Sequence, residues 1–332
     1  MDRARLVMIK GVNATVKLGG MAPAPSLLGR QIKSEKVRDD GRPTPEWRSE
    51  LRRIPGFRNL VTVVLLYTQT IVIIWVAIAL HNPFFYIVAF ALMGRSHAQF
   101  ASLMHESAHR LLFANKSIND FVGRWLLGYP SFVNTDGYRF VHMAHHREEF
   151  GPNEPDIPLY ANYPITRQSF RRKILRDSVG ITGVRLMRDQ FAVLFRGDSR
   201  SRNTQLKILA VQITIFVVLA ASGHPLIYFG LWLLPFLTFW RVINRLRSIA
   251  EHGGLRADAD RRITTHSVRQ AAVTRFALVP YNIGWHLAHH VDSGIPFRSL
   301  PAYHQELRRI GYVTPEYEYL TYRAIWRALQ TK

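Results

Sequence analysis

Apolar residues gather in two pairs of long runs, at residues 60–80 and 84–104 and at residues 206–222 and 226–240. About 20 predominantly apolar residues cross the hydrocarbon core of a bilayer as a helix, and somewhat shorter runs suffice when flanking residues snorkel. Helix breakers separate each pair, at His81-Asn82-Pro83 and at Gly223-His224-Pro225. The pattern therefore predicts four transmembrane helices, the last of them kinked at Pro235.

The segments outside these runs are polar and rich in basic residues. Residues 1–59 form a basic arm, in which residues 45–54 place Trp47, Leu51 and Ile54 at helical spacing. We expect this stretch to be an amphipathic helix on the membrane surface. Residues 105–205 form a long connection between the second and third runs, and the chain after residue 253 is soluble in character.

Charge indicates which side of the membrane these segments occupy. Lys and Arg number 44 against 23 Asp and Glu, a formal net charge of +21. Nucleic-acid binding is one interpretation of such an excess, but the basic residues are scattered and form no recognition module. The two short turns lack Lys and Arg, so the positive-inside rule places the arm, the connection and the tail in the cytoplasm. We expect a multi-pass integral membrane protein with both termini cytoplasmic, in the inner membrane if the source is bacterial, and no nucleic-acid partner.

Histidine is concentrated in three short boxes on the side predicted to be cytoplasmic. The chain has 14 histidines, and eight of them lie in these boxes. The boxes are His105-Glu106-Ser107-Ala108-His109, His142-Met143-Ala144-His145-His146 and His286-Leu287-Ala288-His289-His290. On a helix, positions i, i+3 and i+4 share one face, so each box directs its imidazoles toward one place.

Such a concentration of imidazole indicates metal binding. The chain has no cysteine, which excludes thiolate sites and iron–sulfur clusters and leaves nitrogen and oxygen ligands. Eight imidazoles exceed what one tetrahedral zinc ion requires. The set is suited to two metal ions that share a pocket.

At residues 60–305 the sequence resembles the membrane fatty acid desaturase superfamily, whose members include related hydroxylases and ketolases. The three boxes carry the resemblance, in their order and with a pair of spans between the second and third. Two flanking segments, Arg247–His252 and Leu300–His304, are also similar to segments of that superfamily. The resemblance implies an all-α membrane protein, with four transmembrane helices and a cytosolic helical cap holding a di-iron site. Residues 306–332 then form a cytosolic C-terminal tail.

The resemblance also implies the chemistry and its ligands. Two irons and O2 would remove hydrogen from an unactivated C–H bond, which acid–base side chains alone cannot do. We expect a double bond to be introduced into a fatty acyl or similar lipid chain. Hydroxylation, ketone formation, terminal-alkene formation and desaturation of a small secondary metabolite are the alternatives within the superfamily. The implied metal ligands are His105, His109, His142, His145, His146, His252, His286, His289 and His290.

Residues around the ligands are expected to orient them, because a ligating imidazole usually donates its other N–H to an acceptor. Candidate acceptors are Glu106, Glu149, Asp156, Glu251 and Asp292. His97, at the end of the second run, either lines the pocket or is a buried histidine with a backbone partner. His81, His224, His266 and His304 are expected to be structural or exposed.

Electrons must come from outside, because the chain shows no haem or flavin motif. The basic cytosolic segments would attract an acidic ferredoxin or cytochrome b5-type donor, or the headgroups of the bilayer. One alternative of another class remains: His105-Glu106-Ser107-Ala108-His109 matches the H-E-x-x-H signature of zinc metalloproteases, with Glu106 as the base. That hypothesis leaves the other two boxes unexplained.

Overall fold

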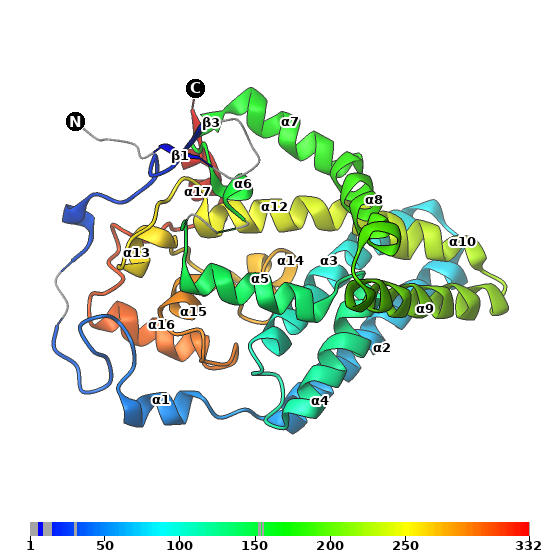
Figure 1. The fold of residues 1–332 in the computed structure, drawn as a ribbon, viewed down its shortest axis with the longest axis horizontal. Coiled ribbons are helices and arrows are strands. Elements are labelled where there is room, and N and C mark those ends of the chain that lie inside the picture. Colours follow the sequence, from blue (N-terminus) through cyan, green and yellow to red (C-terminus); the bar gives the residue numbers. More distant parts are fainter. Residues whose placement is uncertain (1–5, 9–14, 30–31, 152–153, 155, 332) are drawn as a thin grey trace. The chain divides into compact units, whose positions relative to one another are not determined.

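The computed structural model describes the chain except for residues 1–5, 9–14, 30–31, 152–153, 155 and 332, so parts of the predicted basic arm lie outside the described residues. The described chain is mostly helical, as predicted (Figure 1). It also contains four short strands, which the all-α prediction missed. Each strand has only two or three residues, too few to leave an alternating pattern that could be recognised in the sequence.

The described chain divides into two compact units, each assembled from separated segments. The first, called the box unit here, comprises residues 1–54, 140–171 and 245–332. The second, called the helical unit, comprises residues 55–139 and 172–244. Three helices contain a boundary between the units: α5 (Thr135–Arg147), α7 (Arg167–Ser178) and α12 (Phe239–His252).

Long apolar helices form most of the helical unit. Helix α2 (Gly56–Leu80) packs along α3 (Pro83–Ala108), as Figure 1 shows. The side chain of Asn82 caps α3 by accepting a hydrogen bond from the backbone of Phe84. The remaining elements are α4 (Lys116–Phe121), η2 (Val122–Gly128), η3 (Tyr129–Ser131), α8 (Ile181–Arg196), α9 (Ser199–Ala221), α10 (Pro225–Ile227), η4 (Tyr228–Leu233) and α11 (Leu234–Leu237).

Among the described helices, three segments are long and apolar enough to cross a membrane: residues 56–80, 199–221 and 225–252. They contain the predicted first and fourth spans and all of the predicted third span except its last residue, Ser222. The predicted second span is also helical, as part of α3, but it does not reach the same apolarity. Arg95, Ser96, His97 and Gln99 occupy its second half, and the last three of them are buried. Polar groups of this kind inside a long helix commonly face a protein interior.

The fourth predicted span is irregular, in agreement with the kink expected at Pro235. A π-helical turn, η4, comes directly before α11, in which Pro235 is the second residue. Regular helix is interrupted at Thr238, with φ −123° and ψ −82°, and resumes as α12. Proline lacks a backbone N–H and disturbs the hydrogen bonds of the preceding turn, which accounts for the π turn.

Short helices and loops form the box unit. They are η1 (Pro25–Leu27), α1 (Pro45–Leu51), α6 (Ile157–Tyr160), α13 (Arg261–Thr264), α14 (Ala272–Ala277), α15 (His286–Val291), α16 (Leu300–Arg309) and α17 (Tyr322–Ala328). Strands β1 (Leu6–Met8) and β2 (Thr15–Lys17) pair antiparallel, and β3 (Ile165–Thr166) pairs parallel with β4 (Gln330–Thr331).

The arm before α1 is part of the core of the box unit. Val16 and Leu18 are buried against Phe150, Tyr160 and Leu255. Helix α1 is anchored as well, because Trp47 packs edge-on against Tyr303 of α16, with 5.8 Å between ring centroids. The Tyr303 hydroxyl donates a 2.7 Å hydrogen bond to the carbonyl of Gly41. Part of the apolar face predicted for the surface helix is therefore used inside the protein.

Candidate metal centre

Three helices bring seven of the nine predicted ligands together in the box unit. Helix α5 carries the second histidine box, α15 carries the third, and His252 is the last residue of α12. Their shared helical spacing directs the imidazoles of each box to one face. Six of the seven are nine-tenths or more buried, and His146 is partly exposed.

The first group of converging nitrogens comes from His142, His146 and His289. The Nε2 atom of His146 lies 3.1 Å from the Nε2 of His142 and 3.1 Å from the Nε2 of His289. Residues from two different boxes, 143 positions apart along the chain, thus aim the same ring atom at one point.

A second group comes from His145, His252, His286 and His290. The Nε2 atom of His286 lies 2.9 Å from the Nε2 of His252 and 3.0 Å from the Nε2 of His290. Ligand atoms of His145, His252 and His290 also lie within 4.8 Å of one another. The rings of His146 and His290 stack with centroids 4.3 Å apart, so the two groups adjoin.

Three of these imidazoles have an acceptor for their Nδ1–H, which leaves Nε2 with a lone pair in the neutral ring. The Nδ1 of His145 donates to Glu154, 2.6 Å away, and the Nδ1 of His252 donates to the carbonyl of Thr264, 2.8 Å away. The Nδ1 of His290 donates to Glu149. A neutral imidazole that donates through Nδ1 has an acceptor at Nε2. His145, His252 and His290 are three such rings, and their ligand atoms lie within 4.8 Å of one another, so this donor set fits bound metal.

Buried carboxylates support this arrangement. Glu149 also pairs with Arg261 at 2.7 Å, and Glu154 accepts a 2.8 Å hydrogen bond from the backbone of Phe150. Glu251 lies 3.6 Å from the Nδ1 of His286. Sequence reasoning proposed Glu149 and Glu251 but missed Glu154, which stands in a proline-rich loop nine residues after its histidine. No spacing rule links a loop residue to a helix face.

The other three proposed carboxylates have different surroundings. Asp292 forms two hydrogen bonds with Arg48, at 2.5 and 3.0 Å. Asp156 groups with His145 and Glu154 as a third possible metal ligand, and burial raises its pKa. Glu106 is buried on α3 of the helical unit.

The surroundings of His286 and His145 shift the pKa values of these two imidazoles in opposite directions. Burial, followed by the neighbouring imidazoles, lowers the pKa of His286 well below its ordinary value. At His145 burial acts in the same direction, but the hydrogen bond and the charge of Glu154 outweigh it and raise the pKa. The carboxylate thus strengthens the ring as a base, as expected for a metal ligand.

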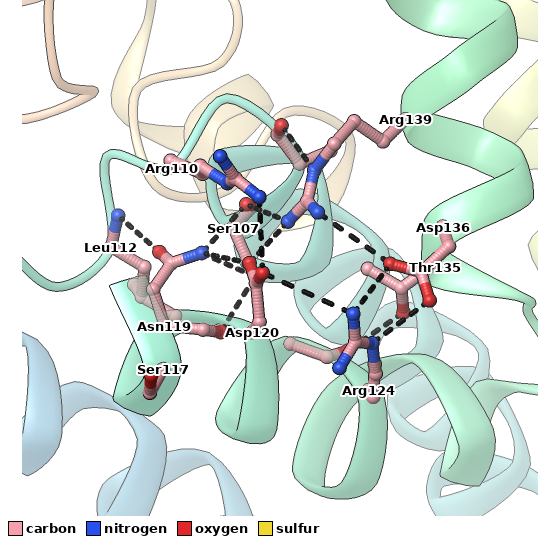
Figure 2. A network of polar contacts seen from close by, with 12 residues as sticks. Ser107, Arg110, Leu112, Ser117, Asn119, Asp120, Arg124, Thr135, Asp136 and Arg139 are labelled. Atoms are coloured by element: carbon pink, nitrogen blue, oxygen red, sulfur yellow. Dashed lines mark hydrogen bonds and ion pairs between the residues drawn. The ribbon is translucent and has the colours of Figure 1, made fainter. Parts of the chain in front are cut away.

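The first box lies in the helical unit, at the end of α3. His105 is buried in the last turn, His109 is the C-cap residue, and their ring centroids lie 4.8 Å apart. Figure 2 shows the polar network beside this box. Arg139 donates to the carbonyls of Ser107 and Ala108, at 3.1 and 2.9 Å, and so caps the helix end that holds both histidines.

Asp120 is the acceptor at the centre of that network (Figure 2). It pairs with Arg139 at 2.6 Å, with Arg110 at 3.3 Å and with Arg124 at 3.9 Å. Burial alone would raise the pKa of Asp120, but the hydrogen bonds from Arg139 and Asn119 and the nearby positive charge lower it. The first box is thereby fixed to α4 and to the first half of α5.

Four histidines outside the proposed ligand set are either held by structural contacts or exposed. His97 is buried and its Nε2 donates to the carbonyl of Trp232 at 3.0 Å, which fits the backbone-partner alternative. His266 donates to the carbonyl of Gly253, and His304 pairs with Glu318 at 3.0 Å. Both are buried structural residues, as expected, while His81 is exposed.

The described chain thus combines helices that are long and apolar enough to cross a membrane with a buried histidine cluster that could hold metal. The fatty acid desaturase family model matches residues 81–326, so the chain belongs to that family.

Two relatives are named as desaturases. Dihydrorhizobitoxine desaturase of Bradyrhizobium elkanii is 24% identical over 229 residues, which cover 64% of this chain and 64% of that protein. Delta(8)-fatty-acid desaturase 1 of Arabidopsis thaliana is 25% identical over 169 residues, which cover 46% of this chain and 37% of that protein. The matches thus span less than two thirds of the length of either relative.

Proposed function

We propose that the chain is a membrane-bound, O2-dependent di-iron desaturase that introduces a double bond into a fatty acyl chain or a similar lipid chain. The observation that carries the proposal is the convergence of seven imidazoles in two adjoining groups, three of them with Nδ1 bonded to an acceptor and Nε2 left for metal. Two groups suit two metal ions, and imidazole is a good ligand for iron. The family assignment supports desaturase chemistry over the zinc metalloprotease alternative.

The proposed ligand set comprises the nine histidines expected from the sequence, including His105 and His109 of the first box. The family model covers all three boxes, which supports including the first. When bound, two irons supply the O2-dependent oxidation that removes two hydrogens from adjacent carbons.

The chain's own residues prepare the site for this chemistry. Glu149, Glu154 and the carbonyl of Thr264 keep the protons of three imidazoles on Nδ1 and leave Nε2 for metal. Burial of the cluster keeps bulk water away from the oxidant, which limits side reactions. The carboxylates are themselves held, Glu149 by Arg261 and Glu154 by the backbone of Phe150.

Topology and partners are part of the proposal. Four spans, with α3 as the second, would place both termini and all boxes in the cytoplasm. Reduction of O2 to two waters takes four electrons, and the substrate's two C–H bonds supply only two. An external ferredoxin or cytochrome b5-type protein would supply the others, and the basic composition suits an acidic donor.

A second candidate is desaturation of a small metabolite. The relative in Bradyrhizobium elkanii is named for dihydrorhizobitoxine, whereas the Arabidopsis relative is named for a fatty acid. Hydroxylation or ketone formation uses the same kind of site and differs in where the substrate lies.

Profiling of lipids and soluble metabolites in expressing cells tests the proposal. Cells with the wild-type chain should contain an unsaturated product that cells with His289→Ala lack. His224→Ala is the matched control, because His224 lies outside the three boxes, and its product level should equal wild type. Detection of a hydroxylated product in place of an unsaturated one would favour the hydroxylase alternative over desaturation. Equal product from His289→Ala and wild type would refute the metal site.

A further inference from the structure

A cavity of about 630 Å3 adjoins the histidine groups within the box unit. Two metal-ligand candidates form part of its wall, His146 of the first group and His290 of the second. Arginine is the commonest residue in the rest of the wall, at Arg38, Arg42, Arg48, Arg52 and Arg261. The proposed desaturase chemistry does not itself require arginine at this place.

Ion pairs fix two of these arginines beside the histidines. Asp292, two residues after His290, accepts two hydrogen bonds from the guanidinium group of Arg48. The same carboxylate accepts a 2.9 Å hydrogen bond from the backbone N–H of Gly294. Arg261 pairs with Glu149 and donates to the backbone carbonyl of His146 at 3.1 Å. The cavity wall is therefore preorganised at the edge of the cluster.

Positive charge in the wall exceeds the negative charge that faces it. Arg38 and Arg42 share Asp40, at 3.4 and 3.8 Å, in pairs that are about half exposed and hence weak. Arg52 has no acidic partner in the part of the chain that the structure describes. A concave site with excess guanidinium attracts anions, and guanidinium matches the planar geometry of carboxylate and the oxygens of phosphate.

We propose that this cavity binds a carboxylate or phosphate group of the enzyme's own substrate, next to His146 and His290. This inference rests on the proposed function. A saturated hydrocarbon gains nothing from guanidinium, so the group that enters here is not the chain itself. The volume suits a small metabolite or the head group of a larger molecule. The anion comes either from a free acid or from a phosphate-bearing carrier or lipid.

Arg52 and its neighbour provide a matched pair of variants. Both side chains are exposed, they are adjacent and equally charged, and of the two only Arg52 lines the cavity. Iron-loaded full-length protein in neutral detergent is titrated with pyrophosphate and, separately, with butyrate by calorimetry. Saturable binding is expected for wild type and Arg53→Ala, and about tenfold or greater weakening for Arg52→Ala. Tighter pyrophosphate binding indicates a phosphate-bearing source, and comparable butyrate binding indicates a free acid.

Three results would overturn the inference. They are no saturable binding by wild type, equal losses in Arg52→Ala and Arg53→Ala, or a raised KM for the reduced electron donor with unchanged anion binding. The last result would make the cavity a docking site for the donor. Iron content is measured in every sample, and Arg42→Ala replaces Arg52→Ala if the latter loses iron. The titration needs no turnover, so a chain that binds the anions without desaturating refutes the proposed function and leaves the anion site standing.

Discussion

The Nδ1 atom of His145 lies 2.6 Å from the Oε1 atom of Glu154, and both side chains are buried. This contact sets the tautomer of one proposed ligand and orients its ring toward the second group of imidazoles. It also ties the ligand to a loop, because the other carboxylate oxygen of Glu154 accepts the backbone N–H of Phe150.

Glu154→Ala should therefore weaken iron binding by about 10- to 100-fold, since acceptors behind metal-ligating histidines typically contribute that much. Iron retained per chain after dialysis against a graded series of chelator concentrations measures the effect. Glu148→Ala is the control, because Glu148 is exposed and close in sequence, and it should behave as wild type. Equal iron retention in the two variants would contradict the role given to Glu154.

Arg139→Ala should destabilise the helical unit by about 1–3 kcal/mol, because it leaves a partly buried carboxylate and two helix-end carbonyls without their donor. Thermal unfolding in detergent measures the change. Arg110→Ala removes a more exposed partner of the same Asp120 and should cost about 1 kcal/mol or less. If the two variants lower the melting temperature equally, Arg139 is not the principal donor of the network.

Gly183→Ala should destabilise the packing of α8 against α11. A Cβ atom at Gly183 would lie 2.1 Å from the backbone oxygen of Leu237, so the two helices would have to separate, at a cost of about 1–3 kcal/mol. Gly230→Ala is the comparison, because a Cβ at Gly230 meets nothing within 4 Å and should be neutral or slightly stabilising. Thermal unfolding of both variants checks the contrast, and a wild-type melting temperature for Gly183→Ala would contradict the close approach.

Stability of the box unit should depend on the ionisation of Glu318 in acid. Burial alone would raise the pKa of Glu318, but hydrogen bonds and charges from His304 and Arg308 outweigh it and lower the pKa to about 2. A lowered folded-state pKa contributes stability that is complete above the unfolded-state value and is lost as pH falls toward 2.

Glu318→Gln should accordingly cost about 2 to 3 kcal/mol at pH 7, and its deficit relative to wild type should shrink as pH falls from about 4.5 toward 2. Unfolding followed at pH 7, 4.5 and 3 measures this convergence. Glu316→Gln, at an exposed position two residues earlier, should show no such dependence. A deficit for Glu318→Gln that stays constant over this range would contradict the assignment.

Local patterns in the sequence predicted the elements that depend on neighbours along the chain. The apolar run 60–80 lies within α2, and the second and third boxes are helical, because helical spacing and hydrophobicity are local properties. Glu149 and Glu251 could be proposed because they stand close in sequence to a box or to His252. Helix α3 was also predicted, but the polar residues in its second half make it less apolar than the three segments that could cross a membrane.

Contacts between distant segments could not be predicted. Arg48 and Asp292 are 244 positions apart, and no periodicity connects an arginine of the arm with an aspartate two residues after the third box. Glu154 escaped notice for a related reason, since a loop residue reaches its histidine through tertiary packing. Val16 and Leu18 entered the core although the arm lacks a clear pattern, because burial there depends on residues near positions 150, 160 and 255.

Iron content of the purified protein, measured with Mössbauer spectra on iron-57-loaded material, tests the central claim most directly. The account predicts about two irons per chain with coupled spectra for wild type, and loss of this signal in His145→Ala and His289→Ala. One zinc per chain that ferrous iron does not replace on reconstitution, or unchanged iron in both variants, would contradict it.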